Sequence, residues 1–156
     1  WRQAQQAIKA MIKDKAAPLG RDGVVLVDGT AGIRLPNGLY LKYPNLRSQE
    51  TEENKEYVYD TKRGKAIVPN RIYGGKIIEN VCQALARIVI GDQMLLINKK
   101  YPVVMTVHDA IACLVPEAEA DNALEFVMLA MRIRPEWAPD LPLNCEAGSG
   151  DNYGDC

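Results

Sequence analysis

The sequence predicts an α+β fold in which a mostly antiparallel sheet packs with one long helix and with flanking helices. The long helix is indicated by apolar residues that recur at helical spacing from residue 73 to about residue 100. Hairpins are indicated on both sides of it, where short apolar runs flank turn residues. The chain has no internal repeat, and its 156 residues suit a single domain that covers residues 1–156.

Before the long helix, the pattern predicts one helix, one strand, two hairpins and a loop. The first helix is amphipathic and is expected to end at Pro18 and Gly20. The first hairpin turns at Asn37-Gly38, which is the strongest short turn signal. The segments are a helix over 1–17, a strand over 24–27, a hairpin over 33–43, an exposed charged loop over 47–56, and a hairpin that joins 57–59 to 66–68.

Beyond the long helix, residues 101–117 read YPVVMTVHDAIACLVPE. Two apolar runs flank His108-Asp109, and we predict a hairpin of two buried strands with this pair at its bend. A carboxylate fixed at a tight turn can hold a hard cation, although an Asp in a turn is also ordinary turn chemistry. The remaining segments are an amphipathic helix over 117–132, a last strand over 141–147 and a glycine-rich tail over 148–152.

The composition is that of a globular protein, with 47% apolar and 25% charged residues. No run approaches the length of a membrane span and no leader opens the chain, so no membrane partner is expected. The four cysteines form no CxxC pair, which favours reduced thiols and a cytoplasmic location. Residues 1–100 carry a net charge of +7 and residues 101–156 a net charge of −8. This fits a polyanion-binding surface plus a cation site, or simple complementarity between the two parts.

The long helix carries a second candidate site. Lys76, Asn80, Gln83 and Arg87 are spaced four, three and four residues apart, which places them on one side of the helix, opposite its apolar residues. Such a stripe can be an ordinary solvated face. It is rich in amides, however, and these side-chain types can donate hydrogen bonds to groove acceptors and phosphates of a nucleic acid.

Several chemistries are excluded or weakened by the residues that are absent. His108 is the only histidine, which excludes zinc sites built on His pairs. The sequence contains no GxSxG, Walker A or dinucleotide GxGxxG motif. A nucleophilic pair of Cys113 with His108 is conceivable, but Cys113 lies in an apolar run where the pKa of its thiol should rise.

The long helix and the hairpin together resemble the C-terminal palm region of family A DNA polymerases, the DNA polymerase I-like enzymes, of bacteriophage type. The resemblance rests on YGGKIIENVCQALAR followed by YPVVMTVHDAIACLVPE. IRLPNGLYLKYPNL upstream and RPEWAPDLPLNCEAGSGDNY downstream fit the same family. It covers most of the chain, most closely residues 33–44 and 71–153.

The resemblance implies template-directed nucleotidyl transfer in DNA replication by a two-metal mechanism with Mg²⁺, and primer-template DNA and dNTP as partners. Asp109 matches the metal-binding aspartate of the family's VHDE motif, and His108 matches the catalytic-site histidine near the primer terminus. Gln83 matches a helix glutamine that contacts the minor groove. The implied location is the cytoplasm, which is the host cytoplasm for a phage protein. The stripe alone adds three DNA-binding candidates, Arg87, Asn80 and Lys76.

Two departures from the family pattern matter. Ala110 stands where the family usually has Glu. The family's other catalytic aspartate and its fingers helix lie upstream and have no counterpart in these 156 residues. The two-metal site is therefore expected to be only partly present, the isolated chain to be inactive, and the missing N-terminal part of the polymerase to be a partner. Two other interpretations stay open, a non-catalytic duplex-DNA-binding accessory module on a palm-like fold and a plain structural domain.

Overall fold

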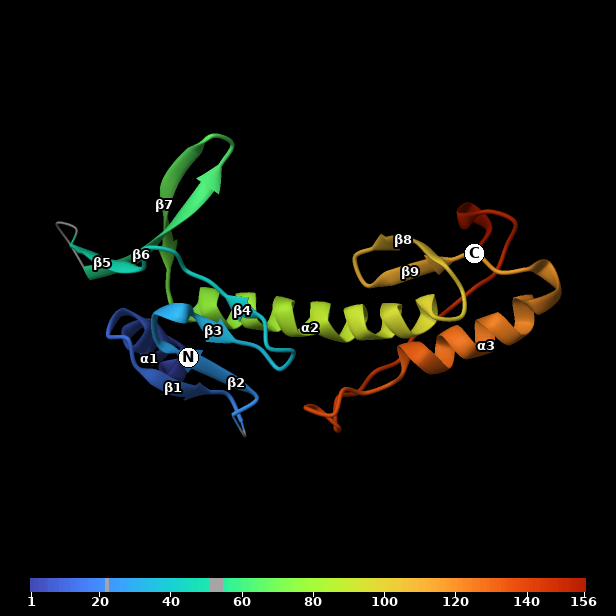
Figure 1. Cartoon of the computed structure of the whole chain (residues 1–156), viewed down its shortest axis with the longest axis horizontal. Helices are drawn as coiled ribbons and strands as arrows, with labels where there is room; N and C mark the ends of the chain where they lie inside the picture. Colours follow the sequence, from blue (N-terminus) through green and yellow to red (C-terminus); the bar gives the residue numbers. More distant parts are fainter. Residues whose placement is uncertain (22, 51–54) are drawn as a thin grey trace. The chain divides into compact units, whose positions relative to one another are not determined.

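The computed structural model describes residues 1–21, 23–50 and 55–156 (Figure 1). It confirms the α+β fold, because the chain combines helices with antiparallel sheets. The chain forms two compact units, Trp1–Leu85 and Ala86–Cys156. The predicted long helix is confirmed as α2, Gly74–Asn98, which begins in the first unit and ends in the second.

The first unit contains two antiparallel sheets, with strand orders β1-β2-β3-β4 and β5-β6-β7. Both hairpins predicted for this part of the chain are confirmed, since β3 pairs with β4 and β6 pairs with β7. The elements are α1 (Arg2–Ile12), β1 (Ala16–Leu19), β2 (Val25–Asp28), the 3₁₀ turn η1 (Gly29–Ala31), β3 (Ile33–Arg34), β4 (Tyr40–Leu41), β5 (Arg47–Glu50), β6 (Lys55–Arg63) and β7 (Ala66–Ile72).

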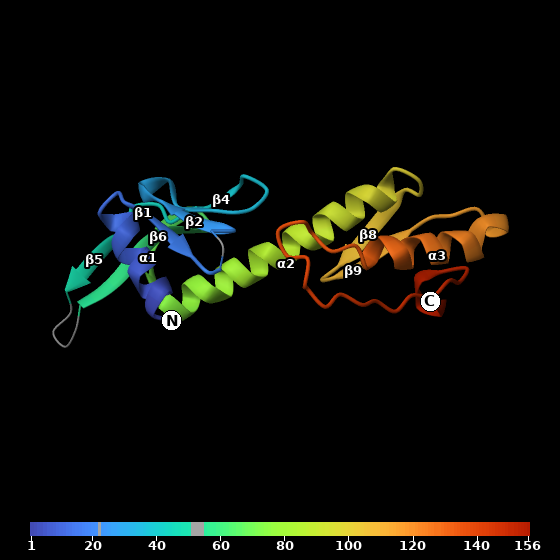
Figure 2. The ribbon, with the colours of Figure 1, turned by 90° about the horizontal axis from the view of Figure 1, so that it is seen from below.

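The core of the first unit includes one face of α1 and the inner residues of the β1–β4 sheet. Helix and sheet lie side by side in both views (Figure 1, Figure 2). Strand alternation buries Val25 and Val27 of β2 and leaves Leu26 exposed. The first turns of α2 add Ile77 and Val81 to the same apolar cluster.

A glycine lets the start of α2 approach α1 closely. The Gly74 N–H donates a hydrogen bond to Oε1 of Gln5 at 2.9 Å. A Cβ atom on Gly75 would collide with the ring of Trp1. A Cβ atom on Gly74 would lie 3.2 Å from the backbone N of Gln5, so Gly74 permits the close approach of the two helices, whereas the exposed ring of Trp1 can move away from a side chain at residue 75.

The second unit contains the C-terminal part of α2, a hairpin and a further helix. The hairpin and the helix predicted after it are both confirmed, although the helix begins with a 3₁₀ turn. The buried apolar residues of the second unit come from α2, from Tyr101 and from α3. The elements are β8 (Val103–Val107), β9 (Ala110–Cys113), η2 (Glu117–Glu119), α3 (Ala120–Met131) and η3 (Tyr153–Asp155).

One buried polar side chain links α2 to the end of α3. Gln93 is 4% exposed, and its Nε2 donates hydrogen bonds to the carbonyl oxygens of Met131 at 2.8 Å and Ile133 at 3.2 Å. Helix C-termini leave carbonyls without partners inside the helix. Gln93 satisfies one such group at Met131 and the carbonyl of Ile133 just beyond the helix, so the burial of its Nε2 group is compensated.

The predicted end of the first helix is wrong, because α1 ends at Ile12. The chain turns at Asp14, whose φ is +52°, and the following residues pair with β2 as strand β1. Oδ1 of Asp14 accepts hydrogen bonds from the N–H and the hydroxyl of Thr30, at 2.9 and 3.1 Å, and these bonds lower the pKa of Asp14. The N–H groups of Asp14 and Lys15 also donate to the carbonyls of Met11 and Ala10, so a local C-cap, supported by the contact with Thr30, ends the helix before Pro18.

The predicted charged loop over 47–56 is also wrong where the structure describes it. Residues 47–50 form β5 and residues 55–56 begin β6, while residues 51–54 lie outside the described residues. β5 lies at the edge of its sheet. Charged residues are common on edge strands because they discourage pairing with other chains, which explains why this strand has the composition of a loop.

The last predicted strand, over 141–147, does not form. Arg132 at the end of α3 holds this segment instead. Its Nε donates to Oδ1 of Asn144 at 3.1 Å, and its Nη2 donates to the carbonyl of Cys145 at 3.4 Å. The segment is therefore attached to α3 by side-chain hydrogen bonds and not to a sheet by backbone pairing.

Two broader expectations also need correction. The described residues form three separate antiparallel sheets, of four, three and two strands, where one sheet was predicted.

The 25 residues of α2 are long and apolar enough to cross a membrane by length and composition, although no such run was expected. Amides and small residues, more than charges, separate its apolar residues. Buried core helices meet the same criterion.

Substituting Gln93 tests its role in joining α2 to α3. Gln93→Ala should lower the free energy of unfolding by about 1–3 kcal/mol, because two carbonyls lose their donor in a buried site. Urea denaturation followed by circular dichroism measures this change. Gln6→Ala, at an exposed position of α1, is the control and should change the free energy of unfolding by less than about 0.5 kcal/mol. Equal effects of the two substitutions would contradict the role assigned to Gln93.

Candidate functional site

The β8–β9 hairpin carries His108 and Asp109 at its tip. The strand pairing ends at Val107 and Ala110, which leaves a turn of two residues. His108 has a φ of +54°. Hairpin turns of this length need positive φ at one or both central residues and usually place Gly, Asn or Asp there. A His in this conformation costs on the order of 1–2 kcal/mol, and such strain is concentrated at functional sites.

The base of the hairpin is anchored within the second unit. Oδ1 of Asn98, the last residue of α2, accepts a hydrogen bond from the N–H of Val103 at 3.0 Å. Tyr101 is buried, and its hydroxyl donates to Oε2 of Glu119 at 3.1 Å. These contacts fix where β8 begins, and the strand register then fixes where the turn lies.

The strands themselves are more exposed than predicted, so the expectation of two buried strands is wrong. Val104 and Val107 of β8 are 56% and 41% exposed, and β9 is half-buried apart from exposed Ala110. Asp109 is exposed, and no hydrogen bond or ion pair found among the described residues involves its carboxylate. The carboxylate is therefore available to a ligand from outside.

Asp109 does not make a complete metal centre with the other residues that the structure describes. Within residues 1–21, 23–50 and 55–156, no three His, Cys, Asp or Glu side chains gather closely enough to hold an ion. Mg²⁺ requires near-octahedral oxygen ligands and is commonly held by one or two carboxylates together with waters and substrate phosphates. One carboxylate beside one imidazole does not fit a complete two-metal site.

A nucleophilic cysteine at this hairpin is not supported. Cys113 pairs with Val103 at the base of the hairpin, whereas His108 lies at the tip. Burial raises the pKa of the Cys113 thiol, which keeps it protonated and poorly nucleophilic.

The stripe on α2 contains an acidic residue that the sequence analysis left out. Oε1 of Glu79 accepts a hydrogen bond from Nζ of Lys76 at 2.9 Å and one from Nε2 of Gln83 at 3.5 Å. The hydrogen bond that Lys76 donates to Glu79 raises the pKa of Lys76. The i,i+3 and i,i+4 spacing of these residues was the signal that could have predicted the contacts.

Asn80 has a structural contact of its own. Its Nδ2 donates to the hydroxyl of Tyr43 at 3.1 Å, and burial raises the pKa of that hydroxyl. Gln83 and Arg87 are exposed on α2. Lys76, Asn80 and Gln83 belong to the first unit, while the second unit holds Arg87 and the hairpin tip with His108 and Asp109.

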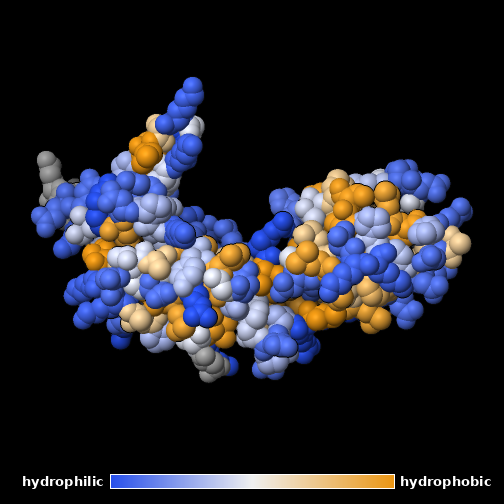
Figure 3. Space-filling model, viewed as in Figure 1, coloured by the Kyte–Doolittle hydropathy of each residue, from blue (hydrophilic) through white to orange (hydrophobic). Residues whose placement is uncertain are grey.

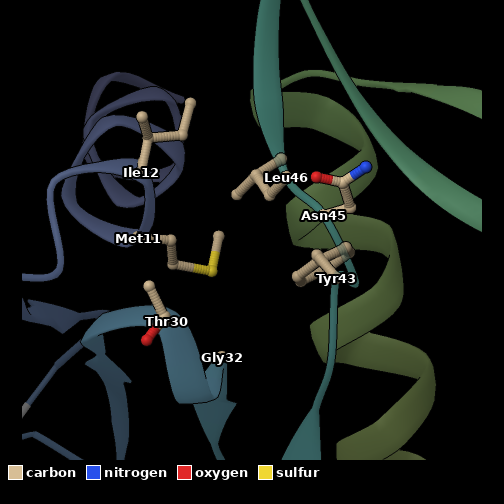
Figure 4. Close-up of a pocket in the computed structure, with 7 residues that line it drawn as sticks. All are labelled: Met11, Ile12, Thr30, Gly32, Tyr43, Asn45 and Leu46. Carbon is tan, nitrogen blue, oxygen red and sulfur yellow. The ribbon is translucent and has the colours of Figure 1, made fainter.

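A cavity of about 180 Å³ lies in the first unit between the end of α1 and the segment after β4 (Figure 4). Its polar side chains already have partners. The hydroxyl of Thr30 donates to Asp14, and Nδ2 of Asn45 donates to Oδ2 of Asp60 at 2.9 Å. We assign no ligand to this cavity. Its lining residues are Met11, Ile12, Thr30, Gly32, Tyr43, Asn45 and Leu46.

Comparison with known proteins gives one informative match. This chain is similar to the DNA polymerase of Bacillus phage SP02. The two sequences are 34% identical over 153 residues, which cover 94% of this chain and 23% of the relative. The chain thus spans less than a quarter of the length of that polymerase. No family model matches the chain, and no solved structure matches it. The similarity supports a function related to DNA polymerases of phage type.

The strain at the hairpin tip can be measured directly. His108→Gly should raise the free energy of unfolding by about 1 kcal/mol relative to His108→Ala, because both variants lack the imidazole and glycine alone adopts positive φ without strain. Urea denaturation of the two variants gives the difference. If the glycine variant is no more stable than the alanine variant, the backbone at residue 108 is not strained.

Proposed function

We propose that this chain is a palm fragment of a family A DNA polymerase of bacteriophage type, with a part in template-directed nucleotidyl transfer during DNA replication. The observation that carries the proposal is the position of Asp109, exposed at a two-residue turn in a chain that is similar over 94% of its length to a phage DNA polymerase. Primer-template DNA, dNTP and the upstream part of the polymerase are the proposed partners.

In this proposal Asp109 supplies one carboxylate to a two-metal site for Mg²⁺. A two-residue turn between paired strands fixes that carboxylate with little conformational freedom, as a catalytic group requires. Because no group of three His, Cys, Asp or Glu side chains forms among the described residues, the 156 residues alone are proposed to be inactive. His108 is proposed to act beside Asp109, near the primer terminus.

The exposed stripe on α2 is the proposed contact with duplex DNA. Gln83 can donate from its amide to minor-groove acceptors, which are nearly the same for all base pairs. Arg87 adds a positive charge for phosphate. Lys76 and Asn80 complete the set, although Glu79 already holds Lys76 and the amide of Asn80 already donates to Tyr43.

The alternative is a non-catalytic module that binds duplex DNA on a palm-like fold. Ala110 favours it, because the position after Asp109 lacks the carboxylate that the family usually has there. The two proposals agree on DNA binding through α2 and differ in the role of Asp109.

Duplex binding is tested by removing the two exposed stripe residues. Gln83→Ala/Arg87→Ala should weaken binding of the chain to a labelled DNA duplex and lower the salt slope of log K by about 1, since one cation is lost. Fluorescence anisotropy at several salt concentrations measures both. The control is Lys9→Ala/Lys13→Ala, in the last turn of α1 and directly after it, which removes two exposed cations and should matter less. Equal losses of affinity would refute the stripe as the DNA contact.

Catalysis is tested in a full-length polymerase that contains this segment. Asp109→Asn keeps the shape of the side chain and removes its charge, so it should slow single-turnover incorporation by at least about 10²-fold with nearly unchanged affinity for primer-template. Ala110→Glu restores the usual family residue and should change the rate modestly. Normal rates for Asp109→Asn together with lost activity for Ala110→Glu would refute the assigned metal ligand and favour the non-catalytic module.

A further inference from the structure

The outer half of the β6–β7 hairpin is a two-stranded ribbon that no other strand covers. β5 pairs with β6 only as far as Val58, whereas β6 and β7 continue to pair up to Arg63 and Ala66. Beyond Tyr59, β7 is therefore the only strand that pairs with β6 among the described residues. We call residues 61–68 the arm, and its outward course is visible in Figure 1.

The arm carries an excess of positive charge without acidic partners. Lys62, Arg63 and Lys65 are exposed, and none of the ion pairs within the described part of the chain involves them. The arm itself contains no Asp or Glu. Asp60, just before the arm, is already bound to Arg47 at 2.8 Å. The three cations at the tip are therefore free to pair with an external anion.

The arm also exposes a large apolar side chain among these cations. Ile67 is 73% exposed and is paired with Lys62 across the ribbon, so both side chains lie on one face. Figure 3 shows apolar surface on this projection between hydrophilic atoms. Because no core lies behind this ribbon, folding does not bury Ile67. Its side chain therefore adds no hydrophobic stabilisation to the folded chain.

We propose that the arm is a second DNA-binding element, separate from the stripe on α2. Lys62, Arg63 and Lys65 neutralise phosphates of duplex DNA, and Ile67 contacts sugars and base edges in a groove. A two-stranded ribbon has the width that a major groove admits, and apolar side chains between cations are also used to pack into grooves. Phosphate supplies the charge complementary to the tip, and the groove supplies apolar surface for Ile67.

The phosphate contacts are tested by the salt dependence of duplex binding. Lys62→Ala/Arg63→Ala/Lys65→Ala should lower the affinity of the 156-residue chain at least tenfold at low salt. It should also reduce the slope of log K against log salt by about 2.7, since each phosphate contact contributes about 0.9. The matched control, Lys9→Ala/Lys13→Ala/Lys15→Ala, removes the same charge from exposed positions of the same unit. Equal changes in both triple variants would overturn the proposal.

The groove contact is tested with a substitution that leaves the charge unchanged. Ile67→Thr keeps a β-branched side chain and should weaken duplex binding several-fold with an unchanged salt slope. Leu39→Thr, at a 65% exposed position of another hairpin in the same unit, should have no effect. If Ile67→Thr binds like the unsubstituted chain, Ile67 makes no groove contact and that part of the proposal fails.

A single-stranded oligonucleotide of the same length identifies the partner. The unsubstituted chain should bind the duplex more tightly, and the arm variant should lose that preference. Equal affinity for both forms would overturn the assignment of duplex DNA.

The Gln83→Ala/Arg87→Ala variant in the same assay separates this proposal from the polymerase assignment. A loss confined to the arm variant supports the arm alone, and a loss confined to the α2 variant supports the stripe alone.

Discussion

The periodicity of α2 is the constraint on which both units depend. The helix contributes Ile77 and Val81 to the core of the first unit, and Val89 and Ile97 are buried in the second. Each such side chain stabilises the fold by about 1.5–3 kcal/mol when fully buried. Because α2 contributes to the cores of both units, its apolar positions tolerate few substitutions. The residues at its other positions remain available for binding. Gln93 shows the cost of a polar residue on the buried side, since both of its hydrogen bonds must be made inside the protein.

The hairpin tip owes its geometry to short-range interactions. Asn98 fixes the first residue of β8, and strand pairing fixes the register. Because the pairing ends at Val107 and Ala110, His108 and Asp109 form the turn. This geometry requires positive φ at His108, a backbone conformation that glycine adopts with less strain than histidine. A strained, exposed histidine next to an unpaired carboxylate has no evident structural purpose, which is why the tip carries the functional proposal.

Features set by neighbouring residues could be predicted from the sequence, and features set by distant partners could not. The hairpin at Asn37-Gly38 follows from turn chemistry and the hairpin at His108-Asp109 from the apolar runs that flank it, and both exist. The end of α1 combines local backbone hydrogen bonds at Asp14 and Lys15 with a contact between Asp14 and η1, sixteen residues away, and no local pattern contains the second of these. The candidate site shows the same division, because the turn position of Asp109 was predictable whereas the contact of Asn80 with Tyr43 was not.

The charges of the two units impose different conditions on a polyanionic ligand. The first unit carries 14 Lys and Arg against 9 Asp and Glu, and the second carries 5 against 11. In the proposed DNA complex, the cations of the arm need no counter-ions to contact the DNA backbone. The second unit as a whole is net negative, which disfavours phosphates unless counter-ions accompany them, so in the proposed function a nucleotide would arrive together with its cations. In the proposed complexes salt would therefore act in opposite directions on the two units, because it would screen the attraction of the first for DNA and the repulsion of nucleotides by the second.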